Sequence, residues 1–197
     1  MSHSEEVQDI DLNKLDITES FSESVKAPLI RMSLESSVKG CQCEPRILVV
    51  DDIQFNILPV KLMIQENFQL EIEEAHNGQV ALEKFKQGYE KECGCPNRAF
   101  NLIFMDLQMP VMGGIEASKL INEMQKDEEL AHIVALTAFT NKKSIAECHN
   151  VGIKSVLNKP LNYKELHKVM WKHYFRVETK EYPGIYKKEF KNTYVEE

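Results

Sequence analysis

The chain has 197 residues, enough for one domain of ordinary size with extensions, and 43% of them are hydrophobic. Its net charge of -7 lies mostly at the start, because residues 1–45 hold nine acids and four bases while the rest is nearly neutral. No basic stripe typical of nucleic-acid binding is present, no apolar run approaches the roughly 18 residues of a membrane span, and no signal peptide opens the chain. We therefore expect a soluble, cytoplasmic protein with neither nucleic-acid nor membrane contact.

The composition divides the chain into three parts. Residues 1–45 contain eight serines and little apolar periodicity, so we expect a mostly disordered extension or linker. The body spans residues 46–175, and residues 176–197 form a tail too short for a DNA-binding output domain. Aromatic residues recur every fourth position in this tail, which predicts either a helix covering the body or a disordered segment. The initiating Met1 favours a complete chain over the end of a larger one.

Apolar runs and helical patterns alternate five times along the body. The patterns predict strands over 46–50, 69–75, 102–105, 133–136 and 155–158, and helices over 56–64, 79–86, 114–124, 142–150 and 163–174. Pro59 is compatible with its helix if it lies in the first turn, where its missing N–H would have no partner. Residues 87–99 are expected to form a surface loop. The alternation predicts an α/β fold with a doubly wound parallel sheet.

Four of the predicted strands end in polar residues. Asp51 and Asp52 follow the first strand, Asp106 the third, Thr137 the fourth and Lys159 the fifth. Each has an ordinary explanation alone, such as a turn aspartate, a β-branched strand residue or a surface lysine. Ligands bind beyond the carboxyl ends of parallel strands in open sheets, so their recurrence at successive strand ends predicts one shared site.

The residue types in this site indicate phosphoryl chemistry. Three carboxylates in one place repel unless a cation lies among them, and Mg²⁺ prefers carboxylates, a backbone carbonyl and waters. With Mg²⁺ and Lys159 present the local charge sums to zero, so the site can admit a phosphoryl group. Asp106 is the natural nucleophile, and Thr137 can donate a hydrogen bond to a phosphoryl oxygen.

From about Arg46 to Phe175 the chain resembles the receiver domain of two-component response regulators, and in motif style the receivers of hybrid histidine kinases. The motifs that carry the resemblance are Leu48 to Asp52 with Asn56, Ala75 to Gly78 with Ala81 and Leu82, Asp106 to Pro110 with Met112 to Gly114, Leu136 to Ala138, and Lys159 with Pro160. The resemblance implies a flavodoxin-like fold of five helices and a five-stranded sheet in the order 2-1-3-4-5. It also implies a phosphoacceptor signalling domain with self-catalysed aspartyl phosphorylation and dephosphorylation rather than an enzyme.

The same resemblance assigns roles to the site residues. Asp106 would accept phosphate from a phosphohistidine on a histidine kinase or a histidine phosphotransfer protein. Asp52, Asp106 and the Gln108 backbone carbonyl would bind Mg²⁺ directly, and Asp51 would act through water. Lys159 would pair with the phosphoryl group, which the N–H groups of Leu107 and Ala138 would contact, and the Lys159–Pro160 bond would be cis.

One position departs from an ordinary signalling receiver. Val156 stands where an aromatic residue usually couples to the threonine, so we expect a relay or sink role, or a modified output face. Gln108 and Phe139, two residues after Asp106 and Thr137, flank the path of the hydrolytic water in this family. The bulky Phe139 would restrict that water, so we expect slow dephosphorylation. Gln54, Phe55 and Pro59 would lie beside the site, where a helical bundle carrying the donor histidine can dock, although Phe55 could instead be packed inside.

Two other classes of function remain to be weighed. A phosphorylation-independent binding module on the same fold is the alternative, but the complete acid set gives no reason to prefer it. A haloacid-dehalogenase hydrolase needs a second aspartate at position 108, where this chain has Gln108.

The five cysteines include two C-x-C pairs, Cys41 with Cys43 and Cys93 with Cys95. Structural zinc sites usually have longer spacing, and the first pair lies in the predicted linker, so we expect neither a metal nor a disulfide there. Cys148 is expected to be a buried small hydrophobe on a helix.

Overall fold

A computed structural model describes residues 43–44, 46–138 and 141–177. Five parallel strands form one sheet in the order β2-β1-β3-β4-β5, which confirms the predicted α/β receiver fold. The strands are β1 (Ile47–Val50), β2 (Ile72–Ala75), β3 (Leu102–Asp106), β4 (His132–Thr137) and β5 (Ser155–Asn158).

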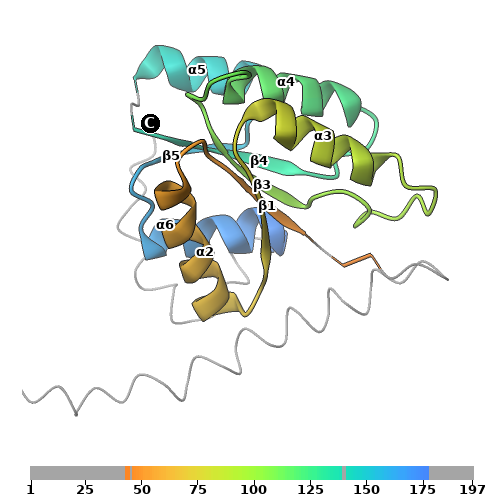
Figure 1. The fold of residues 1–197 in the computed structure, drawn as a ribbon, viewed down its shortest axis with the longest axis horizontal. Helices are drawn as coiled ribbons and strands as arrows, with labels where there is room; N and C mark the ends of the chain where they lie inside the picture. The colour runs from red at the N-terminus through yellow and green to blue at the C-terminus, as the bar shows by residue number, and fades with distance from the viewer. Residues whose placement is uncertain (1–42, 45, 139–140, 178–197) are drawn as a thin grey trace, which may run out of the picture.

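Helices cover both faces of the sheet (Figure 1). They are α2 (Gln54–Phe68), α3 (Gly78–Tyr89), α4 (Gly114–Met124), α5 (Lys142–Asn150) and α6 (Tyr163–Val169), and α6 continues into the π-helical turn η2 (Met170–Tyr174). Figure 1 shows α2 and α6 on one face and α3, α4 and α5 on the other. None of the helices within the described residues is long and apolar enough to cross a lipid bilayer.

The two faces of the central strands supply two separate cores. In β1, Ile47 and Val49 pack with α2, α6 and η2, whereas Leu48 and Val50 pack with α3, α4 and α5. Successive side chains of a strand point to opposite faces, so a strand covered on both sides is apolar at every position. This burial explains why the central strands appear in the sequence as unbroken apolar runs.

Helix α2 is longer than the sequence pattern indicates, and the expected place of Pro59 is wrong. The helix begins at Gln54, so Pro59 is its sixth residue rather than part of the first turn. A proline there removes one intrahelical hydrogen bond. Burial of Ile57, Val60, Ile64 and Phe68 against the sheet holds the helix together despite that loss.

The segment between α3 and β3 is only partly the surface loop expected for residues 87–99. Helix α3 continues to Tyr89, and Cys95, Asn97, Arg98 and Ala99 are buried. Arg98 donates hydrogen bonds to main-chain carbonyls of this loop, which is why a charged residue can lie inside. Phe139, most of residues 1–45 and the tail from residue 178 lie outside the described residues, so the expectations for them stay predictions.

Candidate functional site

The carboxyl ends of the strands bring the predicted site residues to one edge of the sheet. The register of β1 with β3 pairs Val50 with Met105, so the next residues, Asp51 and Asp106, come level on neighbouring strands. Thr137 is the buried last residue of β4, and Lys159 follows β5 directly. The convergence inferred from the strand ends is present in the fold.

Lys159 joins the two buried carboxylates. Its Nζ atom lies 2.5 Å from Oδ2 of Asp51 and 3.0 Å from Oδ2 of Asp106. The backbone N–H of Lys159 donates to the carbonyl of Thr137 at 2.8 Å, which fixes the start of the segment after β5. The peptide bond from Lys159 to Pro160 is cis, as the resemblance implied.

Asp51 is held by donors from the start of α2. Its Oδ1 accepts hydrogen bonds from the backbone N–H of Ile53 at 3.0 Å and from Nδ2 of Asn56 at 2.9 Å. The sequence analysis gave Asn56 no role of its own. Its role could have been inferred from its position. Asn56 comes four residues after Asp52 and lies in the first turn of α2, which begins beside the acids.

Asp106 is buried, and burial raises the pKa of its carboxyl above the ordinary value. The negative charge of Asp51 also raises this pKa, while Lys159 and the backbone N–H of Gln108 lower it. Burial disfavours the charged form of a carboxyl more than these donors favour it. The ionised Asp106 is therefore a carboxylate whose charge is only partly compensated by the protein.

The three acids are close enough together to share one cation. Carboxylate oxygens of Asp51, Asp52 and Asp106 all lie within 4.8 Å of one another, and Asp52 is exposed at the mouth of the site. An all-oxygen donor set with access to water is what Mg²⁺ requires. Gln108 is exposed in the loop after β3, and its N–H lies 3.5 Å from Oδ1 of Asp106.

Close backbone contacts fix the loop that follows Asp106. The N–H of Gly114 donates to the carbonyl of Leu107 at 3.0 Å, and the N–H of Gly78 donates to the carbonyl of Met112 at 3.0 Å. A Cβ atom at Gly114 would lie 2.0 Å from the carbonyl oxygen of Asp106, so no larger residue fits there. The loop is thus attached to both α3 and α4.

A cavity of 610 Å³ extends from the acids along α2. Its polar end is lined by Asp52, Asp106 and Lys159, and its apolar wall includes Phe55 and Pro59. Phe55 is 83% exposed, so the alternative that it is packed inside is wrong. The cavity and the exposed ring form a surface next to the Asp106 carboxylate.

A doubly wound parallel sheet with an acidic cluster and a lysine at its carboxyl edge defines a phosphoacceptor signalling domain. The chain belongs to the response regulator receiver domain family, whose model matches residues 47–170. Over 120 residues, 59% of this chain, it is 35% identical to hybrid signal transduction histidine kinase M of Dictyostelium discoideum. It spans a tenth or less of the length of the first relatives it matches.

Two solved structures share the fold. The Ssk1 receiver in complex with the Saccharomyces cerevisiae phosphotransfer protein Ypd1 has a TM-score of 0.57 and 28% identity, covering 66% of this chain and 89% of that one. The Mg²⁺-bound receiver of the Arabidopsis thaliana histidine kinase CKI1 has a TM-score of 0.56 and 30% identity, covering 64% of this chain and 89% of that one.

Proposed function

We propose that this chain accepts a phosphoryl group from a phosphohistidine onto Asp106, in a reaction that depends on Mg²⁺, and relays it or signals through partner proteins. The observation that carries the proposal is the contact of the Lys159 ammonium with both Asp51 and Asp106 beside the exposed Asp52. This arrangement holds a nucleophile, a cation and a metal-binding carboxylate within one site.

The reaction needs little from the protein beyond positioning and charge. A carboxylate oxygen of Asp106 attacks the phosphorus atom, the P–N bond to the donor imidazole breaks, and its electron pair returns to the nitrogen. Before the reaction the Lys159 ammonium contacts both Asp51 and Asp106. As the phosphoryl group arrives, the ammonium moves toward its oxygens. The chain's own groups perform these steps, so phosphorylation is self-catalysed. Dephosphorylation would use the same groups: a water attacks the phosphorus atom, the P–O bond to Asp106 breaks, and the carboxylate and inorganic phosphate are released.

Mg²⁺ would be held by Asp52, Asp106 and the Gln108 carbonyl, with Asp51 contacting it through water. When bound, it supplies positive charge that offsets the phosphoryl oxygens in the transition state. The hydroxyl of Thr137 and the N–H groups of Leu107 and Ala138 donate to the same oxygens. Asn56 keeps Asp51 oriented toward Lys159 and the metal.

The donor docks on the surface made by α2 and the cavity. Phe55, Leu58 and Leu62 are exposed at helical spacing along α2, so this helix presents an apolar stripe next to the acids. The similar Ssk1 receiver was crystallised with a histidine phosphotransfer protein. A helical bundle that presents its phosphohistidine between Phe55 and Asp106 fits this surface, and such a protein or a histidine kinase is the partner we propose.

The output differs from that of an aromatic-switch receiver. Val156 is partly buried against the core beneath α3, α4 and α5. It has no ring that could move when Thr137 engages the phosphoryl group. We propose that residues 46–175 act as a relay or sink, or through an altered output face, between an N-terminal linker and a short tail.

Intact mass after incubation with Mg²⁺ and acetyl phosphate tests the chemistry. We expect one added HPO3 group in the wild type, and none in Asp106→Asn or in the presence of EDTA. If the wild type gains no phosphate from acetyl phosphate or from a phosphorylated histidine phosphotransfer protein, the chain is a phosphorylation-independent binding module instead.

A further inference from the structure

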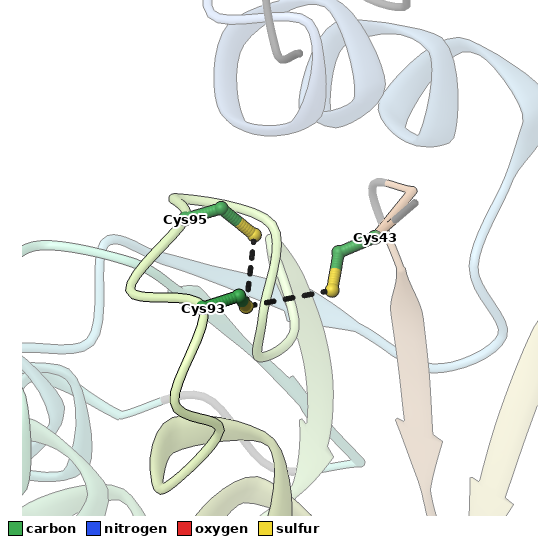
Figure 2. Close-up of side chains that lie close together, drawn as sticks. All are labelled: Cys43, Cys93 and Cys95. Carbon is green, nitrogen blue, oxygen red and sulfur yellow. Dashed lines mark hydrogen bonds between the residues drawn. The ribbon is translucent and has the colours of Figure 1, made fainter. Parts of the chain in front are cut away.

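Three thiols meet at the opposite edge of the sheet from Asp106. Figure 2 shows the side chains of Cys43, Cys93 and Cys95 pointing toward one another. The Sγ atom of Cys93 lies 3.8 Å from that of Cys43 and 3.6 Å from that of Cys95, and all three lie within 4.8 Å of one another. The sequence analysis expected no linkage of these cysteines, and it did not foresee this cluster.

The spacing matches metal ligands rather than a disulfide. A sulfur–sulfur bond is about 2.05 Å long, well below either distance. Four thiolates around Zn²⁺ at about 2.3 Å form a tetrahedron whose edges are about 3.8 Å. The Cys43–Cys93 and Cys93–Cys95 sulfur distances of 3.8 and 3.6 Å are therefore close to the edges of such a tetrahedron.

The fold explains why the distant segments meet. Cys43 lies just before β1, and the other two cysteines lie in the loop before β3. Strands β1 and β3 are parallel neighbours, with Ile47 paired to Leu102, so the segments that enter them run side by side. A pair of hydrogen bonds fastens them, one from the N–H of Asn101 to the Arg46 carbonyl at 2.9 Å and one from the Arg46 N–H to Oδ1 of Asn101 at 3.0 Å.

Arg98 holds the cysteine loop in shape from within. Its guanidinium donates to the carbonyls of Tyr89 at 3.1 Å, Gly94 at 3.2 Å and Cys95 at 3.1 Å, and pairs with Glu128 at 2.8 Å. Gly94 has φ +60, a left-handed conformation that favours glycine, between Cys93 and Cys95. The loop is thus a supported turn, and ligands on supported backbone bind a metal without first being ordered.

We propose that Cys43, Cys93 and Cys95 bind one Zn²⁺ ion as thiolates. Soft sulfur ligands in tetrahedral spacing favour zinc over Mg²⁺, so this site is chemically distinct from the carboxylate cluster. The ion joins the segment before β1 to the loop before β3. These three thiolates fill three of the four positions of a tetrahedral zinc site, which leaves the fourth to a water molecule or an added ligand.

Zinc titration of the full chain tests this proposal. The protein is reduced, stripped of metal with a chelator and titrated with Zn²⁺ against a chromophoric competitor. A second metal-free sample is titrated with Co²⁺ to record sulfur-to-metal charge-transfer bands and tetrahedral ligand-field bands. We expect one equivalent of Zn²⁺ per chain and thiolate-type Co²⁺ spectra. Cys93→Ser, which removes the central ligand, lowers the zinc affinity by about tenfold or more.

Cys148→Ala is the matched control, because Cys148 is buried on α5 and burial raises the pKa of its thiol. We expect this variant to bind zinc as the wild type does. Phosphorylation of Asp106 in Cys93→Ser shows that the variant folds, and it keeps failure of the zinc site distinct from failure of the phosphoacceptor site. Absence of zinc binding by the reduced wild type overturns the proposal, and so does equal affinity in Cys93→Ser. Formation of a Cys43–Cys93 disulfide in a protein that binds no zinc overturns it in favour of a redox pair.

Discussion

The imidazole rings of His132 and His173 contact each other through their Nδ1 atoms, 3.2 Å apart. One ring must donate and the other accept, so the contact needs at least one neutral imidazole. The other ring nitrogen of His173, Nε2, lies 2.9 Å from Oγ of Ser155. The pKa of both histidines is lowered to about 4, chiefly by burial. The cations Lys154 and Lys172 contribute to this lowering for both rings, and Arg176 contributes for His132, where the charge of Glu129 opposes it.

This pair makes the fold sensitive to acid. The folded-state pKa of about 4 lies below the ordinary 6.5, so above pH 6.5 both the folded and the unfolded chain hold neutral rings and nothing is lost. Between pH 6.5 and 4 the unfolded chain takes up protons that the folded chain does not. We expect the free energy of unfolding to fall by about 1 to 3 kcal/mol per histidine across that window.

Urea denaturation at a series of pH values checks this expectation. His132→Gln removes one of the two titrating rings, so its free energy of unfolding falls less steeply between pH 6.5 and 4 than that of the wild type. His167, which is buried and whose pKa is also lowered to about 4, remains in both proteins and keeps part of the slope. Parallel pH curves for the two proteins would contradict the assignment.

Asp106→Asn should stabilise the fold at neutral pH in the absence of Mg²⁺. The raised pKa of Asp106 means that its charged form is disfavoured in the folded state, first by burial and then by Asp51. This cost is present above the folded-state pKa and disappears as the pH falls toward the ordinary value of 3.8. Thermal unfolding of both proteins with EDTA at pH 7 and pH 4 should show a difference only at pH 7.

Mg²⁺ should stabilise the wild type by mass action. At a concentration ten times its Kd, a ligand that binds only the folded state adds about 1.4 kcal/mol to the free energy of unfolding. Asp52 is exposed, so Asp52→Asn should leave the metal-free stability intact and remove most of this gain. Asp127→Asn, which changes an exposed acid in the segment between α4 and β4, is the control that keeps it.

Gly114→Ala should damage both stability and phosphorylation. Its Cβ would lie 2.0 Å from the Asp106 carbonyl oxygen, so β3 or α4 must shift. We expect a loss of about 1 to 3 kcal/mol and little transfer to the displaced carboxylate. Gly113→Ala is the matched change, since its Cβ would meet the Leu107 oxygen at 3.3 Å, and its effect on urea denaturation and acetyl phosphate labelling should be smaller.

Phe55→Ala should separate docking from chemistry. The side chain is 83% exposed, so the free energy of unfolding should change by less than about 0.5 kcal/mol. Transfer from phosphorylated Ypd1, used as a surrogate donor, should slow about tenfold, while labelling by acetyl phosphate stays unchanged. Lys86→Ala on α3 is the exposed control, and equal slowing in that variant would argue against α2 as the docking helix.

The sequence predicts the sheet and the phosphoacceptor site because both follow from local patterns. The central strands β1, β3 and β4 are buried on both faces, and polar site residues end or follow β1, β3, β4 and β5. Parallel packing therefore brings Asp51, Asp106 and Lys159 together without further information. The full length of α2 could not be predicted in this way. Pro59 opposes the helix locally, and only contacts of Ile64 and Phe68 with the distant sheet and η2 extend it.

The cysteine cluster was missed for a related reason. A sequence motif search compares each C-x-C pair with known zinc motifs separately. The fold instead brings Cys43 from the first pair together with Cys93 and Cys95, which form the second pair. The cluster could have been predicted from the positions of Cys43 before β1 and Cys95 before β3, because these two strands are parallel neighbours. A buried arginine inside a polar loop, as at Arg98, has no signature in the local sequence.

The segment after α6 sets practical limits on any shortened version of this protein. The family match ends at Met170, yet Trp171, Tyr174 and Phe175 lie buried against α2, with the ring of Phe175 6.0 Å from that of Phe68. A fragment that ends at Met170 would expose Phe68 to solvent. The exposed apolar surface would favour aggregation. A recombinant fragment that keeps its solubility must therefore run to at least Val177, whose N–H closes the turn on the Trp171 carbonyl at 3.0 Å.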